Sequence, residues 1–190
     1  MTRDRIVASA RSLMRRDGWT KTTIAAIAAD AGVAEQTVYA AFGNKRALLD
    51  GLRSVMQRDS QMPELMAAAA EEPDPQKQLR LWARLVRQQM ETSYDIIAIH
   101  REAARVDEVA ATAYRVVLDR RLEAFTAFIR GLRGRRRPGV DERTATDLLW
   151  AFSNEELWRE LVVERAWTPD RYEEWLGQTL ADQLLPSQTP

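Results

Sequence analysis

The chain has 190 residues, with 28 Lys or Arg balanced by 28 Asp or Glu, one His and no Cys. The lack of Cys excludes a disulfide framework and a thiolate metal site, and the cytoplasm is the simplest compartment for such a chain. No run approaches the roughly 18 apolar residues of a membrane-spanning helix, and the charged N-terminus lacks the apolar segment of a signal peptide, so we expect no membrane contact.

The charges are unevenly spread along this neutral chain. Residues 1–53 hold nine Lys or Arg and five Asp or Glu, a net charge of +4, which leaves −4 for the remainder. A basic N-terminal part suits the phosphates of a nucleic acid. Charge alone does not distinguish this from an ordinary solvated helical surface.

The first two predicted helices lie within the first 31 residues. Apolar residues at steps of three and four predict a helix from about Arg3 to Arg16, which Gly18 closes. Thr23 can cap a second helix whose apolar positions share one face.

A short turn and a third helix follow. Gly32 supplies a turn that tolerates positive φ, and the next helix carries Val38 and Phe42 inward. Gly43 ends this helix and Asn44 caps the next one. Two short helices joined by a Gly-containing turn form a helix-turn-helix, whose second helix fits the major groove of DNA.

These residues resemble the N-terminal pattern of the tetracycline-repressor (TetR) family of transcriptional regulators. The matching positions are Gly18-Trp19, Thr22-Thr23, Ile27-Ala28, Ala31-Gly32-Val33, Thr37, Tyr39, Phe42, Lys45 and Leu48-Leu49. So many residue types at fixed offsets make the match specific, although it covers only about the first quarter of the chain.

The rest of the chain also has helical periodicity and no strand pattern. Helices are predicted at about 45–61, 76–92, 96–105, 109–132 and 141–165, and a last one begins at Pro169 after a Thr168 cap. The fold class is therefore all-α. The resemblance implies a three-helix helix-turn-helix DNA-binding domain at 1–50, with the helix at 45–61 as connector, and a larger helical effector-binding and dimerisation domain at 51–190.

Within the DNA-binding domain we assign each candidate residue a role. The candidate contacts are Thr23, Glu35, Gln36, Thr37, Tyr39, Ala40 and Lys45. Thr23, Tyr39 and Lys45 are expected to bind phosphate and position the protein. Gln36 and Thr37 are expected to read bases, with Glu35 and the Ala40 methyl as lesser candidates.

Two departures from the family pattern concern these contacts. Ala34 stands where relatives commonly have a Ser cap, so the recognition helix lacks a cap that is often worth about 1 kcal/mol. Ala25 and Ala40 replace larger polar readers, which leaves more of the recognition to DNA shape.

A symmetric pair of chains is needed to read two half-sites. The resemblance implies a homodimer joined by the two C-terminal helices of each subunit. Candidate interface residues are Leu157, Leu161, Tyr172, Trp175, Leu176 and Leu180. Each alone fits the core of its own subunit better, but the apolar surface of the two helices together favours a dimer.

The resemblance also implies a repressor that a small-molecule effector releases from a palindromic operator in double-stranded DNA. Candidate pocket residues are Trp82, Met90, Tyr94, Ile97, His100, Tyr114, Phe125, Trp150, Asn154 and Trp158, a mostly apolar set with a few polar groups. Core packing is the ordinary role of each.

No enzyme motif occurs in the sequence: no Cys nucleophile, no paired His residues and no phosphate-binding Gly loop. We therefore predict no enzyme activity, catalytic residue, metal or cofactor. Two alternatives stay open, namely a helical ligand-binding or scaffold protein without operator affinity and, less favoured, an enzyme that uses carboxylates.

Overall fold

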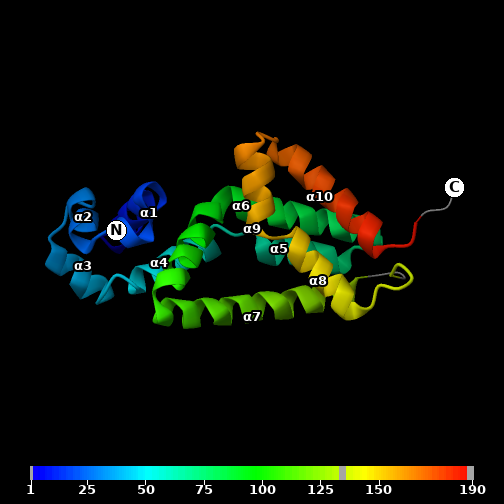
Figure 1. Ribbon diagram of the computed structural model, residues 1–190, viewed down its shortest axis with the longest axis horizontal. Helices are drawn as coiled ribbons and strands as arrows, with labels where there is room; N and C mark the ends of the chain where they lie inside the picture. The colour runs from blue at the N-terminus through cyan, green and yellow to red at the C-terminus, as the bar shows by residue number, and fades with distance from the viewer. Residues whose placement is uncertain (1, 133–135, 188–190) are drawn as a thin grey trace. The chain divides into compact units, whose positions relative to one another are not determined.

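The computed structural model describes residues 2–132 and 136–187, and helices are the only extended regular elements in those ranges. The helices are α1 (Thr2–Lys21), α2 (Ile24–Asp30), α3 (Glu35–Phe42), α4 (Ala47–Arg58), α5 (Met62–Glu71), α6 (Pro75–Val106), α7 (Glu108–Gly131), α8 (Glu142–Phe152), α9 (Glu155–Trp158), the π-helical segment η1 (Arg159–Glu164) and α10 (Pro169–Leu184) (Figure 1). The predicted all-α class is confirmed.

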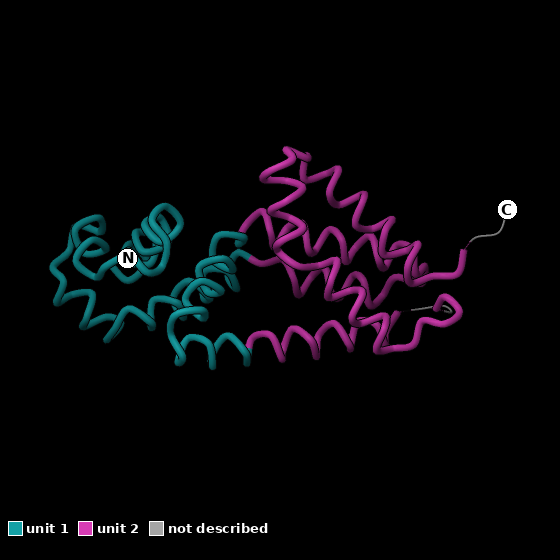
Figure 2. The backbone as a smooth tube through the Cα atoms, viewed as in Figure 1, with its two compact units in different colours: residues 1–59, 93–116 teal, residues 60–92, 117–190 magenta. Residues whose placement is uncertain are grey.

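The chain forms two compact units, each with its own core (Figure 2). Unit 1 extends to Asp59 and includes the segment Ser93–Val116, whereas unit 2 consists of Ser60–Thr92 and the residues from Val117 onward. α6 and α7 therefore each contribute one end to unit 1 and the other to unit 2. The functional boundary predicted at residue 50 stays a prediction.

The core of unit 1 joins the first four helices to the C-terminal part of α6. Ile6 of α1, Ile27 of α2, Val38 of α3 and Leu48 of α4 are fully buried in one cluster. Ile96, Ile99 and Ala103 of α6 belong to the same cluster. Residues far along the chain thus complete the core under the N-terminal helices.

Unit 2 is built around α6, α7, α8 and α10. Leu79 of α6, Ile129 of α7, Leu149 of α8 and Leu176 of α10 have no exposed surface. The buried amide of Gln78 donates to the Ala69 carbonyl of α5 at 2.9 Å, which satisfies a polar group inside this core.

Two sequence predictions about helix boundaries were wrong. The helices expected at 76–92 and 96–105 are one continuous α6, because no Gly or Pro interrupts the chain between them. The helix expected at 141–165 is instead divided after Phe152, where the Asn154 side chain accepts hydrogen bonds from Glu156 and Leu157 and starts α9.

Gly51 in α4 has a steric requirement that the sequence pattern did not reveal. A Cβ added at Gly51 would lie 2.8 Å from Cγ2 of Val7 and 3.3 Å from Cε1 of Phe42. The Val7 side chain is stiff at χ1 and cannot swing away cheaply. Only glycine allows α4 to approach α1 and the Phe42 ring this closely.

We predict that Gly51→Ala lowers the free energy of unfolding by about 1–2 kcal/mol, because overpacking outweighs the better helix propensity of Ala. Urea denaturation followed by circular dichroism measures this change. Gly131→Ala is the matched control, since an added Cβ there meets nothing within 4 Å. Equal effects of the two substitutions would show that Gly51 is not sterically constrained.

Candidate nucleic-acid interface

α2 begins at Thr23 as the sequence predicted. The Thr23 hydroxyl accepts a hydrogen bond from the Ala26 amide at 3.1 Å, which satisfies one of the free N–H groups at the start of the helix. Ile27 and Ala28 are buried below it, while Thr23 itself is exposed. The hydroxyl therefore lies on the surface at a helix N-terminus.

Gly32 makes the turn between α2 and α3. Its φ is +62°, a backbone conformation that costs other residues free energy. The amide of the following Val33 returns to the Ala28 carbonyl at 2.9 Å. The turn is thus fixed by backbone conformation and a backbone hydrogen bond, and nothing crowds the position of a Cβ there.

α3 has one buried and one exposed face. Val38 has no exposed surface and Phe42 is also buried, so these residues fix the helix on the core of unit 1. Tyr39 on the other face is 49% exposed, an unusual value for a large aromatic side chain.

The remaining predicted contacts of α3 lie mostly on that exposed face. Glu35, Gln36 and Ala40 are exposed, and helical spacing places them beside Tyr39, whereas Thr37 is half-buried. The structure thus brings four of the predicted contact residues together on one outward surface.

Lys45 is placed differently from the other candidates. Its ammonium group donates to the Trp19 carbonyl and lies 4.3 Å from the centroid of the Trp19 ring. Burial lowers the pKa of Lys45 from its usual value, and the nearby Glu102 carboxylate opposes this shift. Lys45, which was predicted to bind phosphate, is therefore half-buried and contacts the C-terminal part of α1 at Trp19.

The two ends of α3 are held differently. Ala34 at its N-terminus makes no side-chain hydrogen bond, as the sequence predicted. At the other end, the Gly43 amide donates to the Tyr39 carbonyl at 2.7 Å with a φ of +74° at Gly43, and the Asn44 side chain accepts from the Ala47 amide at 3.1 Å.

Sequence reasoning missed a set of polar contacts from α6 to these N-terminal helices. Asp95 of α6 forms two hydrogen bonds of 2.7 Å with the guanidinium of Arg11 in α1. Glu102, two turns further, accepts from the Trp19 amide at 2.9 Å. No local pattern signals such pairs, because the partners are more than 80 residues apart.

The Glu102 side chain also lies close to Gly18. This residue has a φ of +83°, and a Cβ there would lie 2.9 Å from the Glu102 carboxylate. The Thr22 hydroxyl donates to the Gly18 carbonyl at 2.8 Å, which closes the turn from the other side. The positive φ therefore favours glycine here, whereas the flexible Glu102 side chain could shift to make room for a Cβ.

The ten predicted pocket residues are divided between the two units: Tyr94, Ile97, His100 and Tyr114 are in unit 1, and Trp82, Met90, Phe125, Trp150, Asn154 and Trp158 are in unit 2. His100 has a structural role, because its two ring nitrogens lie 2.8 Å and 3.1 Å from the carbonyls of Ile96 and Leu49. Burial lowers the pKa of His100 from its usual value.

Several of the unit 2 candidates form an aromatic cluster. The ring of Phe125 lies 4.7 Å from that of Trp82 and 5.7 Å from that of Trp150. The Trp82 indole donates to the Ser153 hydroxyl at 2.9 Å. Sequence reasoning missed Arg121, whose guanidinium lies 4.7 Å from the centroid of the Trp150 ring.

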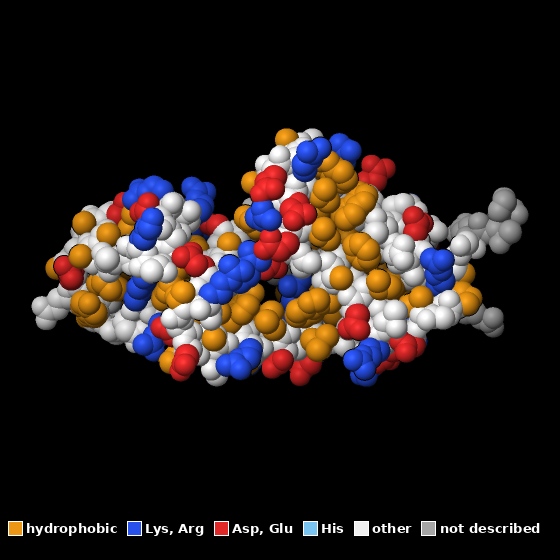
Figure 3. Space-filling model, in the orientation of Figure 1, with side chains coloured by type: hydrophobic (Ala, Val, Ile, Leu, Met, Phe, Trp, Pro, Cys, Tyr) orange, Lys and Arg blue, Asp and Glu red, His pale blue; other side chains and the backbone are white. Residues whose placement is uncertain are grey.

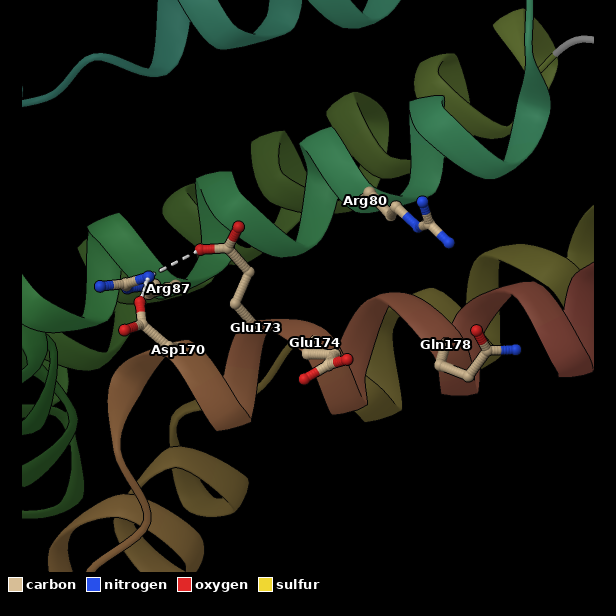
Figure 4. A pocket seen from close by; sticks show the side chains of 6 residues that line it. All are labelled: Arg80, Arg87, Asp170, Glu173, Glu174 and Gln178. Carbon is tan, nitrogen blue, oxygen red and sulfur yellow. Dashed lines mark hydrogen bonds and ion pairs between the residues drawn. The ribbon is translucent and has the colours of Figure 1, made fainter.

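A polar groove lies elsewhere in unit 2, between α6 and α10 (Figure 4). Its volume is about 410 Å³ and its lining residues are Arg80, Arg87, Asp170, Glu173, Glu174 and Gln178. Arg87 is paired across the groove with Asp170 and, at 3.0 Å, with Glu173. None of the ten predicted pocket residues lines this groove.

The predicted interface residues fall into two groups. Tyr172, Leu176 and Leu180 have no exposed surface and contribute to the core of unit 2. Leu157, Leu161 and Trp175 are half-exposed, and the nearby Val163, which the sequence did not suggest, is 58% exposed. Figure 3 shows hydrophobic side chains gathered over the N-terminal half of α10.

The described residues contain neither a membrane-spanning helix nor a group of metal-ligating side chains. Among residues 2–132 and 136–187, no helix is long and apolar enough to cross a membrane. In the same part of the chain, no three His, Cys, Asp or Glu side chains are grouped so that they could hold a metal ion.

Residues 6–52 match the family model of bacterial regulatory proteins of the tetR family. This match covers about a quarter of the chain. The match spans α1 to the middle of α4, the segment in which the sequence pattern was found. A comparison with curated protein sequences gave no significant match.

Solved structures of transcriptional regulators share the fold over almost the whole chain. NalD, the secondary repressor of the MexAB-OprM multidrug efflux pump in Pseudomonas aeruginosa, is 22% identical with a TM-score of 0.74, covering 97% of each chain. The fatty acid degradation regulator FadR from Bacillus halodurans is 19% identical with a TM-score of 0.74, covering 94% of each chain. A regulator from Saccharomonospora viridis in complex with choline is 20% identical with a TM-score of 0.73, covering 96% of each chain. These likenesses show that the chain shares the fold of these proteins.

We predict that Ala34→Ser raises the free energy of unfolding by about 1 kcal/mol by capping α3. Ala34 already has the extended backbone conformation of a helix cap, with φ −72° and ψ 148°, so Ser needs no rearrangement. Thermal and urea denaturation measure the change. Thr23→Ala removes the existing cap of α2 and is expected to lower the free energy of unfolding by a similar amount. If Ala34→Ser does not raise the free energy of unfolding, the N-terminus of α3 is already fully ordered without a cap.

Proposed function

We propose that this chain is a sequence-specific DNA-binding transcriptional regulator that reads DNA with the exposed face of α3. One observation carries the proposal: in a TetR-family domain, Val38 and Phe42 fix α3 on the core while Gln36, Tyr39 and Ala40 face outward. A helix held in this way can enter a major groove without unfolding its support.

Each contact residue has a proposed role. Thr23 and Tyr39 offer hydroxyl groups to phosphates and set the position of the domain on the duplex. Lys45 adds a positive charge at the start of the α4 segment and has N–H donors beyond the one that binds Trp19. Gln36 is the main base reader, because its amide can pair with adenine through two hydrogen bonds.

Half-buried Thr37 completes the base-reading set. Its methyl or hydroxyl group is proposed to contact a base edge, as Gln36, which precedes it in the first turn of α3, is proposed to do. Glu35 and the Ala40 methyl are secondary contacts, to cytosine and thymine respectively.

The proposed functional form is a homodimer on a palindromic operator. A single chain has one recognition helix, and two half-sites require a twofold pair. Leu157, Leu161 and Trp175 support a contact between copies, because they expose apolar surface on the last helical segments. Exposed apolar patches of this kind commonly mark protein interfaces.

We further propose repression that a small-molecule effector relieves. The effector would have to bind one arrangement of the dimer more tightly than the other to shift DNA affinity. The aromatic cluster of Trp82, Phe125 and Trp150 in unit 2 is the proposed region for it.

Structural neighbours bind chemically different ligands: one was solved in complex with choline, and FadR from Bacillus subtilis in complex with stearoyl-CoA. Because a small cation and an acylated nucleotide need different sites, the effectors to be tested should include both classes. Thermal denaturation with a panel of candidates, followed by release from bound duplex, would identify the effector.

DNA binding is tested by selecting duplexes from a random pool and measuring their affinity by fluorescence anisotropy. We predict that Tyr39→Ala and Lys45→Ala each weaken binding at least about tenfold, and that Lys45→Ala also reduces the salt dependence, because each phosphate contact releases counterions. Lys77→Ala in α6 is the control for a lost surface charge.

The outcomes separate the candidate functions. Enrichment of an inverted repeat supports the proposal. A flat titration of the wild type, even at low salt, would favour a scaffold or ligand-binding protein instead, and turnover of a substrate by carboxylates would favour an enzyme. Wild-type binding that neither substitution weakens would contradict the contact assignment alone.

We predict that Leu161→Glu converts the dimer to a monomer, because it places a charge in an apolar interface. Light scattering measures the molar mass. Leu122→Glu is the control, since Leu122 is also apolar and 45% exposed but lies outside the proposed interface. A dimer that persists in Leu161→Glu would place the interface elsewhere.

A further inference from the structure

Arg3, in the first turn of α1, contacts the C-terminal end of α3. Its guanidinium donates to the carbonyl of Ala41 and lies 4.0 Å from the centroid of the Phe42 ring. Neither residue is near Arg3 in sequence, and the family pattern did not include Arg3. The contact therefore calls for an explanation beyond local helix chemistry.

Electrostatics favour this placement of the cation. Arg3 lies at the N-terminus of α1, where the helix dipole disfavours positive charge. At the end of α3 the same charge is favourable, because the last carbonyls of a helix lack partners within the helix. The Ala41 carbonyl is one of these groups, so Arg3 acts on α3 as a cationic cap.

The Phe42 ring is enclosed from two directions. The Arg3 guanidinium lies over it, and its Cε1 lies 3.3 Å from the position that a Cβ on Gly51 would occupy. A planar guanidinium can stack on a ring while its N–H groups bind an acceptor, which an ammonium does less well. The C-terminal end of α3 is thus fixed by α1 and α4, whereas its N-terminal end has no side-chain cap.

We propose that Arg3 is a positioning residue for the recognition helix: it anchors the C-terminal end of α3, so that the exposed face is presented in one orientation. The expected effect of Arg3 on DNA binding rests on the proposed function. The anchoring of α3 by Arg3 does not. Arg3 acts through Ala41 and Phe42 rather than by binding a phosphate itself.

The structural part is tested without DNA by hydrogen exchange of the α3 amides in full-length Arg3→Ala and Arg5→Ala. Arg5 is the matched control, because it is exposed on the same helix and, within the described residues, has no hydrogen bond or ring contact with α3. We expect the amides of residues 38–42 to exchange about tenfold faster in Arg3→Ala only, as local opening loses a charge-assisted hydrogen bond. Equal exchange in the two variants would overturn the proposal.

DNA binding gives the second test, on duplexes selected with the wild type. We expect Arg3→Ala to weaken binding about fivefold more than Arg5→Ala, with the salt dependence of both variants equal. A salt slope that falls by about 0.9 in Arg3→Ala alone would show a direct phosphate contact and contradict the positioning role.

A double-mutant cycle with Phe42→Leu tests whether Arg3 acts on α3 through the Phe42 ring. If Arg3 acts through the ring, the effects of Arg3→Ala and Phe42→Leu on exchange are less than additive. Additive effects would contradict that route. If the wild type binds no duplex, the proposed function fails, while the exchange experiment still decides the role of Arg3.

Discussion

The burial of two side chains, Val38 and Phe42, is the constraint on which α3 and its proposed contact with DNA depend. α3 has eight residues, too few for a helix to persist alone in water, where about 12–15 are marginal. Its stability must come from tertiary contacts. The same contacts determine which side chains face outward, so the stability of the helix and its presentation to DNA have one origin.

Unit 1 achieves this burial by using chain from outside its N-terminal segment. The family match ends at residue 52, yet Ile96, Ile99 and Ala103 of α6 belong to the same apolar cluster as Val38. A domain of about 50 residues buries a smaller fraction of its surface than a larger domain does and is marginal alone. α6 supplies the missing apolar area, and Asp95 and Glu102 add hydrogen bonds that fix the register of the helices.

Local signals in the sequence were sufficient for the helix-turn-helix itself. The Thr23 cap and the Gly32 turn depend on atoms within a few residues, and each was predicted and confirmed. Asn44 accepts a hydrogen bond from the Ala47 amide, but Arg46 occupies the cap position of α4. The position of Lys45 was not predicted, because its partner, the Trp19 carbonyl, is 26 residues away. Residue type showed that Lys45 carries a charge, but only the packing of distant helices shows which group that charge meets.

The uneven support of α3 gives the proposed recognition helix one end held by tertiary contacts and one end without a side-chain cap. Gln36 and Thr37 lie beside Ala34, where no side chain caps the helix, and Phe42 lies at the end held by α1 and α4. Ordering the free end on DNA costs conformational entropy, which lowers affinity. The same freedom lets the first turn adjust to the local width of the groove. A chain with Ala at positions 25 and 40 has few long base-reading side chains, so a recognition helix that follows DNA shape suits it better than one held rigidly at both ends.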